Sequence, residues 1–305
     1  MRPNMEDNFN LLDKRVLDIL SKTDLERTKD QLNRIKGATL CVGVGGSKVV
    51  SDFASKVLSQ KNNCITESIE PRDMLYKNIS TYENVFMCSY GGHNYGVDVS
   101  FNNSLNKYLL SSKTREGVHN ITYQSDLETE DSFISLGATL MPMSILLSFY
   151  TGNDVKLIQE ILESKRDYLV EPSEIYEILT GYDTSVASAF LESTMTESGI
   201  ALPLIHDKYG YCHGRSTISK SGHNSVILLN RGSELDEVLL EEFPKYYRQI
   251  IEIKSRYRDQ IIDDFYLTYQ TMWLARSIAH IKNKDLSRVE YAPMVKKLYH
   301  YKGEM

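Results

Sequence analysis

The 305-residue sequence predicts an α/β protein of two similar modules, each a parallel sheet with helices on both faces, plus helical segments at both ends. Three observations predict this fold class. Apolar runs of strand length alternate with segments of helical periodicity, which is typical of βαβ units. Two strand-like runs end in glycine-rich turns, at residues 43–47 and 89–94. The strand–helix pattern then starts again near residue 175. The two halves share this pattern of elements but have little sequence identity.

The first half begins with helical spacing over residues 9–36, where Leu12, Val16 and Ile19 recur on one face. The apolar stretch 136–150 is shorter than the roughly 20 residues of a membrane span and contains Pro142, so we expect a buried helix there. In order, the elements expected after residue 36 are strand 38–42, helix 48–60, strand 64–69, helix 71–77, strand 85–88, helix 100–111, strand 121–123, helix 132–150 and helix 154–166.

The second half repeats the alternation from a strand at 175–179, which runs into a Thr-Gly-Tyr-Asp-Thr-Ser turn. The elements expected next are helix 186–197, strand 200–205, a new element opening at 213–215, strand 225–229 and helix 234–242, and the last 60 residues are expected to be helical. We divide the chain into N-terminal helices (1–36), a first module (37–152), a second module (153–243) and a C-terminal helical segment (244–305).

The composition indicates a globular protein of the cytoplasm. Hydrophobic residues make up 41% and charged residues 25% of the chain, and the net charge of −6 gives no support to nucleic-acid binding. The first residues contain no apolar core, so we expect no signal peptide. The four cysteines form no CxxC pair and predict reduced thiols rather than a disulfide framework or a zinc site.

A stretch rich in lysine, arginine and tyrosine, residues 245–258, also raises the possibility of nucleic-acid binding. Acidic residues interrupt it, and its apolar residues recur at helical spacing. These features favour a solvated amphipathic helix over a nucleic-acid interface.

The two glycine-rich turns are the most informative part of the sequence. Glycine lets a backbone approach a ligand closely, and serine hydroxyls with free N–H groups at a helix start suit an anion. At the ends of adjacent parallel strands, the two turns would form one crevice. Lys48 stands where the dinucleotide-binding fingerprint needs a glycine, and no phosphate loop of the Walker type is present. A tight turn without a ligand is the alternative interpretation.

These residues resemble a known family. The turn 43–47 (Gly-Val-Gly-Gly-Ser) and residues 88–94 (Cys-Ser-Tyr-Gly-Gly-His-Asn) resemble the loops of the sugar isomerase (SIS) domain, which hold a sugar phosphate. Residues 191–197 and 212–214 are similar to the glutamate helix and His-Gly turn of the isomerase part of glucosamine-6-phosphate synthase and of phosphosugar deglycases. The resemblance covers roughly residues 20–300 and implies two flavodoxin-like SIS modules.

The resemblance also implies a set of site residues. Glu197 would be the base that moves a proton between adjacent carbons through an enediol or enolamine, and His213, 16 positions later, would open the sugar ring. A lysine or arginine would stabilise the developing oxyanion. The implied catalytic residues are Glu197, His213, Lys296 and Lys297, with Arg215 a further candidate, and the implied substrate-binding residues are Gly45, Gly46, Ser47, Ser89, Tyr90, Gly91, Gly92, His93 and Asn94.

In this family the histidine reaches the site of a neighbouring subunit, which implies a homodimer with a shared site. The expected partner is a small sugar or sugar phosphate, with no nucleic acid, membrane, metal or organic cofactor. The predicted activity is aldose–ketose isomerisation, or cleavage of a ketosamine or amino-sugar phosphate by the same proton transfer.

The sequence also departs from the family. Gly91 and Asn94 stand where the family has a phosphate-binding serine and threonine, and Thr194 stands where it has a lysine. The segment 132–134 (Ser-Phe-Ile) aligns with a Ser-Thr-Lys segment and lacks its lysine. These changes leave two alternatives open: a different or larger ligand, read by His93 and Arg72, and a non-catalytic module that binds a phosphosugar as a sensor. A nucleotide-binding α/β protein is a third interpretation, based on fold analogy alone.

Overall fold

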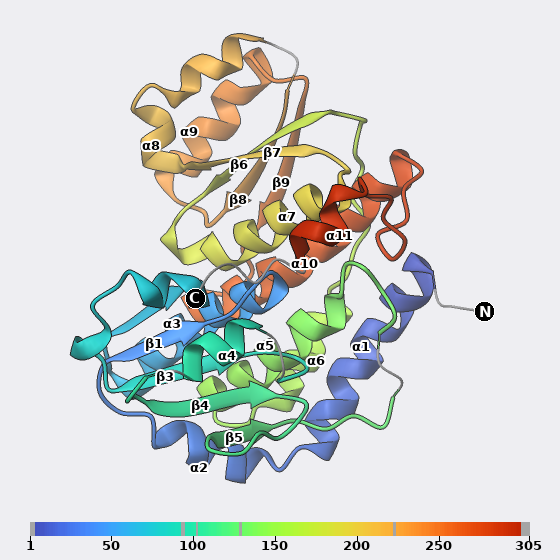
Figure 1. The fold of residues 1–305 in the computed structure, drawn as a ribbon. Coiled ribbons are helices and arrows are strands. Elements are labelled where there is room, and N and C mark those ends of the chain that lie inside the picture. Colours follow the sequence, from blue (N-terminus) through green and yellow to red (C-terminus); the bar gives the residue numbers. More distant parts are fainter. Residues whose placement is uncertain (1–3, 93–94, 102, 128–129, 222–223, 300–305) are drawn as a thin grey trace.

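The structure is a computed structural model that describes residues 4–92, 95–101, 103–127, 130–221 and 224–299 (Figure 1). Its strands are β1 (Thr39–Val42), β2 (Thr66–Ile69), β3 (Asn84–Cys88), β4 (Asn106–Ser111), β5 (His119–Thr122), β6 (Ile175–Thr180), β7 (Leu202–Asp207), β8 (Ser225–Asn230) and β9 (Gln249–Lys254). Its α-helices are α1 (Met5–Lys22), α2 (Leu25–Asn33), α3 (Gly46–Asn62), α4 (Tyr95–Phe101), α5 (Leu136–Thr151), α6 (Val155–Glu163), α7 (Ser185–Ser198), α8 (Lys208–Cys212), α9 (Glu234–Glu242), α10 (Gln260–Ile281) and α11 (Met294–Tyr299). Short 3₁₀ segments include η1 (Pro71–Leu75), η3 (Tyr182–Thr184) and η4 (Arg215–Ser221).

The described strands form two separate, wholly parallel sheets, which confirms the predicted fold class. The first sheet has the order β2-β1-β3-β4-β5, and the second has the order β7-β6-β8-β9. Within each module the chain therefore runs to one side of its first strand and then crosses to the other side. This order is the flavodoxin-like one, and it creates a switch point at the carboxyl edge between β1 and β3 and another between β6 and β8.

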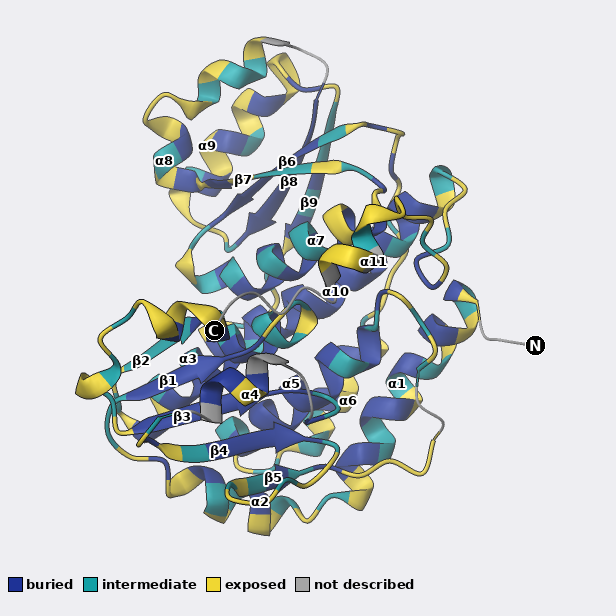
Figure 2. Cartoon of the chain, in the orientation of Figure 1, coloured by how far each residue is buried: buried dark blue, intermediate teal, exposed yellow. Residues whose placement is uncertain are grey.

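Helices cover both faces of each sheet. Successive side chains of a strand point to opposite faces, so apolar residues on both faces need to be buried. In the first sheet, Cys41 and Phe86 pack among the residues of α3 and α5, while Leu40 and Val85 pack on the side of α4 and η1. In Figure 2 the central strands are dark blue, whereas α8 and α9 have exposed faces. Continuous burial of short strands on both faces is typical of parallel sheets.

Helices α3, α5, α7 and α10 form the core between the two sheets. Helix α10 is buried on almost every side, and its Phe265 lies with its ring centroid 6.1 Å from that of Phe53 on α3. Helix α5 is likewise buried, as the sequence predicted. No helix in the described part of the chain is long and apolar enough to cross a membrane.

The prediction of a helix over residues 100–111 is wrong. The chain leaves a short helix at Phe101 and forms strand β4 from Asn106 to Ser111. Tyr108 and Leu110 belong to the core on one face of the sheet, and Leu109 belongs to the core on the other. This run is buried on both faces, so it lacks the alternation of apolar and polar residues that marks a half-buried strand.

The prediction that the last 60 residues are helical is also wrong in one segment. Residues 249–254 form β9 at the edge of the second sheet, next to β8. Ile251 and Ile253 face the core between the sheets, while Ile250 packs on the side of α9. The basic and aromatic stretch 245–258 is thus a strand with its flanking turns and not an amphipathic helix.

Candidate active site

The first glycine-rich turn joins β1 to α3 at the switch point of the first sheet. A Cβ atom on Gly43 would lie 2.0 Å from the carbonyl oxygen of Ser47, so no larger residue fits there. Gly45 has a φ of +56° and is the N-cap of α3, in the left-handed region that favours glycine. A Cβ on Gly46 would lie 2.7 Å from Thr139 Oγ1 on α5. The turn is therefore packed closely against α3 and α5, with no space for side chains at Gly43 and Gly46.

The hydroxyl of Ser47 remains available at this turn. Ser47 is half-buried in the first turn of α3, and its backbone N–H donates to the carbonyl of Val44. Among the described residues, no hydrogen-bond partner is found for its side chain. A hydroxyl at the start of a helix, on the carboxyl edge of a parallel sheet, suits an anionic or polyol ligand.

The second glycine-rich turn follows β3, the strand next to β1. The buried Ser89 accepts a hydrogen bond at its Oγ from the N–H of Gly92, at 3.2 Å. The carbonyl of Tyr90 accepts hydrogen bonds from the hydroxyls of Ser111 and Ser112 after β4. Ser89 therefore holds its own turn in shape, which the sequence did not predict. The two turns lie at one edge of the sheet, as expected from adjacent parallel strands.

Glu197, the predicted base, lies against the first turn. A Cβ atom on Gly45 would be 3.8 Å from Glu197 Oε1, so the carboxylate approaches the glycine closely. The carboxylate is exposed, and Oε1 accepts a hydrogen bond of 2.6 Å from Ser193 Oγ, one turn earlier on α7. Helices α7 and α3 pack together, which brings the last turn of α7 to the first turn of α3. Residues about 150 positions apart thus meet at the first glycine-rich turn.

His213, the predicted ring opener, lies elsewhere in the chain. It follows α8 at the carboxyl edge of β7, whereas Glu197 precedes β7 at the opposite edge of the same sheet. A six-residue strand is roughly 20 Å long, so the two side chains are separated by about that length. In Figure 1, α8 lies on the far side of the second sheet from the first module. One chain therefore does not bring the pair together.

The remaining predicted residues have varied positions. Lys297 is exposed on α11, and Lys296 belongs to the same helix. Arg215 is exposed at the start of η4, beside His213, and Arg72 is exposed on η1. His93 and Asn94, which the sequence predicts as ligand contacts, lie outside the described residues.

The departures from the family pattern also have structural counterparts. Thr194 is buried within α7, so this position supplies no cation near Glu197. A Cβ atom on Gly91 would meet no atom within 4 Å, so the space for a serine is present. The segment 132–134 bonds to the C-terminal segment, because the N–H groups of Phe133 and Ile134 donate to carbonyls of Ser287 and Leu286.

Sequence reasoning missed a charged group beside the first turn. Lys48, which the sequence marked only as a departure from a nucleotide-binding motif, forms an ion pair of 2.5 Å with Asp52 along α3. Glu70 follows β2 at the same edge, and burial raises the pKa of its carboxyl, opposed by the attraction of Lys48. Position directly after a strand is the signal that could have identified Glu70.

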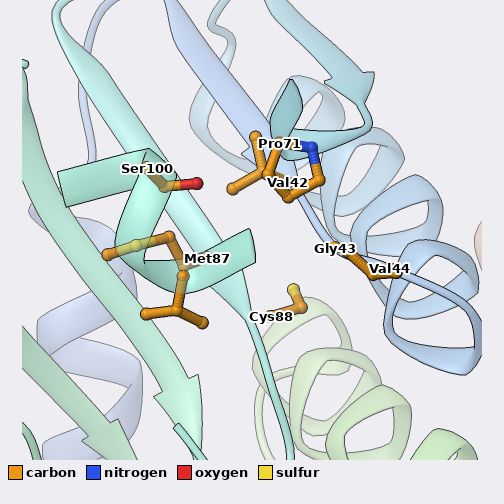
Figure 3. A pocket seen from close by; sticks show the side chains of 8 residues that line it. Val42, Gly43, Val44, Pro71, Met87, Cys88 and Ser100 are labelled. Carbon is orange, nitrogen blue, oxygen red and sulfur yellow. The ribbon is translucent and has the colours of Figure 1, made fainter. Parts of the chain in front are cut away.

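Figure 3 shows a narrow, mostly apolar cavity behind the two turns, between β1, β3, η1 and α4. Val42, Gly43, Met87 and Cys88 are among its lining residues, and it has no room for a water molecule. Burial raises the pKa of the Cys88 thiol, so this sulfur is a packing group and not a nucleophile. A ligand would therefore bind outside this cavity, at the exposed side of the turns where Glu197 lies. In the described part of the chain, no cluster of His, Cys, Asp and Glu is suited to a metal ion.

Comparison with known proteins agrees with this architecture. The chain is similar to tagatose-6-phosphate ketose/aldose isomerase from Escherichia coli, with a TM-score of 0.71 and 15% identity over 95% of this chain and 96% of the other. The fold is that of solved sugar-phosphate isomerases. The C-terminal domain of glucosamine-fructose-6-phosphate aminotransferase from Francisella tularensis matches with a TM-score of 0.70 and 11% identity over 94% and 98% of the two chains. Glucosamine-6-phosphate deaminase from Thermotoga maritima matches with a TM-score of 0.67 and 14% identity over 91% and 98%.

Searches of family models and of curated proteins with this sequence found no match. The similarity is therefore one of structure, and at these identities it establishes the fold. The resemblance that the sequence motifs indicated is confirmed at that level.

Proposed function

We propose that this protein is an isomerase or deglycase that acts on a sugar phosphate or a related sugar derivative. The observation that carries the proposal is the position of Glu197, whose carboxylate lies beside Gly45 at the switch point of the first sheet. A carboxylate next to a ligand-binding turn is the arrangement that proton transfer to a bound sugar requires. The fold shared with sugar-phosphate isomerases and a deaminase supports the same reaction class.

The chemistry follows from the residues at the crevice. The turns at 43–47 and 89–92 bind the sugar or its phosphate through hydroxyls and backbone N–H groups. Glu197 removes the proton from the carbon next to the carbonyl, which leaves an enediol or enolamine, and returns it to the neighbouring carbon. The hydrogen bond from Ser193 holds the carboxylate in place at the turn. Lys296 or Lys297 on the last helix is the candidate for stabilising the developing oxyanion.

His213 requires a second copy of the chain in this proposal. Because it lies at the opposite edge of the second sheet from Glu197, it reaches a crevice only in a homodimer, where it transfers the proton that opens the ring. We propose such a dimer in the cytoplasm, with each site built from two chains.

The proposal is tested with a panel of phosphosugars and ketosamine phosphates. Glu197→Gln removes the base while keeping the size of the side chain, and we expect it to reduce kcat by about 100-fold or more. His213→Ala is expected to lower kcat for ring-closed substrates. Glu192→Gln, the same exchange five residues earlier on the same helix, is the matched control and should retain activity. Turnover that persists in both site variants would refute the assignment.

The alternative is a non-catalytic module that binds a phosphosugar as a sensor. Buried Thr194 in place of a lysine favours it, because the crevice then lacks one cation that the catalytic family has. Ligand binding that raises the melting temperature, without turnover by any member of the panel, would support this function instead.

A further inference from the structure

A basic cavity lies at the carboxyl edge of the second sheet. It has a volume of about 310 Å³ and is lined by Arg231 and Gly232 after β8, by Lys254 at the end of β9 and by residues 255–258 after it. This volume is at the lower end of the range for small-molecule pockets, about 300–1,000 Å³. The crevice outside the carboxyl ends of parallel strands is also where α/β sheets bind ligands.

The cavity lies in the second module at the position that corresponds to the predicted site of the first module. Strand order makes β8 the counterpart of β3, and β9 the counterpart of β4. The turn after β8 (Arg-Gly-Ser at 231–233) therefore corresponds to the glycine-rich turn after β3. The loop 254–258 corresponds to the segment after β4, whose serines hold that turn. Both modules thus present a turn and a supporting loop at the same edge.

Four cationic side chains line this cavity, and one of them, Arg231, holds the loop that forms its wall. Arg231 is paired through Nε with Asp183 at 3.2 Å and through its guanidinium with buried Asp263. Its guanidinium also donates to the carbonyls of Tyr257 and Arg258. Arg231 therefore fixes the loop and is largely neutralised.

The other three cations, Lys254, Arg256 and Arg258, are exposed at the cavity. No described carboxylate lies within ion-pair distance of any of the three side chains. The loop that carries them is held from below, because Asp263 Oδ1 accepts hydrogen bonds of 2.9 Å from the N–H groups of Arg256 and Tyr257. A fixed loop thus presents three positive charges that form no ion pair with a described carboxylate, on a chain whose net charge is −6. Such a local field attracts anions of matching size.

We infer that this cavity is a second ligand site, distinct from the crevice at Glu197, and that it binds a small molecule bearing a phosphate or diphosphate group. Arginine pairs of this kind suit phosphate oxygens through bidentate, charge-assisted hydrogen bonds. The cavity is concave and small, and the whole chain is acidic, so a small phosphorylated compound fits better than a nucleic acid. The inference does not depend on the proposed function of the first module.

The test measures binding of inorganic pyrophosphate by calorimetry to the full chain. We expect the double variant Arg256→Gln/Arg258→Gln to raise the Kd at least about tenfold, because each lost hydrogen bond to a charged group costs about that factor. The matched control is Lys245→Gln/Arg248→Gln, which removes the same charge from the same stretch outside the cavity. These two side chains form exposed ion pairs with Glu242 and Glu171, which contribute little to stability.

A third variant separates the two sites. Ser47→Ala alters the first turn and should leave the affinity for pyrophosphate unchanged. The inference is overturned if pyrophosphate does not bind, if both double variants weaken binding equally, or if Ser47→Ala removes it. It is also overturned if a single-stranded oligonucleotide, and not pyrophosphate, depends on Arg256 and Arg258. Unchanged melting temperatures of the variants show that the fold is retained.

Discussion

The backbone conformation at position 91 does not require a glycine. Neighbouring Gly92 has a φ of +66°, and a Cβ there would lie 3.0 Å from Ser111 Oγ, whereas Gly91 has no positive φ and open space around a Cβ. Replacement of Gly92 would be strained, but replacement of Gly91 would not. The loss of a hydroxyl at Gly91 therefore concerns the ligand and not the fold.

This difference leads to a prediction for Gly91→Ser. The added hydroxyl has open space at the second turn, where it can donate to a bound phosphate, and a hydrogen bond to a charged group contributes about 1.5–3 kcal/mol. We expect about tenfold tighter binding of a phosphosugar, measured by calorimetry. Gly91→Ala is the control, since it adds the Cβ without the hydroxyl. Equal affinities of the serine and alanine variants would indicate that the phosphate does not bind at this turn.

Single residues of the site were predictable only where a local motif encodes them. The left-handed Gly45 and the tight Gly43 belong to a strand–turn–helix pattern that the sequence displays. Glu197 was found by resemblance, and its contact with Gly45 depends on the packing of α7 against α3. Glu70 belongs to no motif, and only its position directly after β2 could have marked it, because its burial and its proximity to Lys48 arise when β2 takes its place in the sheet.

Among the elements, the two strands that the sequence misassigned are those at which periodicity carries least information. Strand β4 is buried on both faces, and β9 (Gln-Ile-Ile-Glu-Ile-Lys) lies within a basic and aromatic stretch of helical spacing. In both segments, pairing with the neighbouring strand decides the structure over local preference. The glycine-rich turns, in contrast, mark the ends of β1 and β3 clearly, and β1, α3 and β3 were predicted.

A buried ion pair joins α3 of the first module to α10. Lys56 Nζ contacts the Asp264 carboxylate and donates to the carbonyl of Tyr182 at 2.6 Å. Asp264 also accepts a hydrogen bond from the N–H of Ala187 at the start of α7. Burial raises the pKa of Asp264 to about 6, although the charge of Lys56 acts in the opposite direction. Asp264 thus links α3 and the start of α7 to α10.

We predict that Lys56→Met destabilises the protein in a pH-dependent way. Removing one partner of a buried pair costs about 3–5 kcal/mol, because it leaves the other charge uncompensated. Without Lys56 the folded-state pKa of Asp264 rises further above its unfolded value. The folded protein then retains a proton that the unfolded chain releases, so its stability is greatest below the unfolded pKa and falls as the pH rises through the folded pKa.

Urea unfolding at pH 5 and pH 8 measures this effect. The free energy of unfolding of Lys56→Met should fall more between the two pH values than that of the unchanged protein. Lys61→Met, on an exposed part of the same helix, is the control and should follow the unchanged protein. A loss in Lys56→Met that is independent of pH would argue against an ionised Asp264 as its cause.

At the scale of the whole molecule, the parallel arrangement of β7 places the two proposed catalytic side chains at opposite edges of one sheet. The helix before a parallel strand ends at the amino edge, and the segment after it begins at the carboxyl edge. Glu197 and His213 are separated by this strand, so their spacing in sequence gives no proximity within one chain. The family resemblance predicted both residues and implied a site shared between two chains, and the topology adds that one chain alone does not bring the two side chains together.

Mixed dimers of the Glu197→Gln and His213→Ala chains are expected to regain activity that either variant alone lacks. In a dimer of a Glu197→Gln chain with a His213→Ala chain, one site contains both altered residues, while the other combines the intact Glu197 of one chain with the intact His213 of the other. Random association makes half of the dimers mixed, so about a quarter of the full activity should return when the variants are unfolded and refolded together. Each variant refolded alone is the control. Size-exclusion chromatography with light scattering measures the dimer in the same samples. A mixture no more active than its components, in samples shown to contain dimers, would mean that the two residues do not act at one shared site.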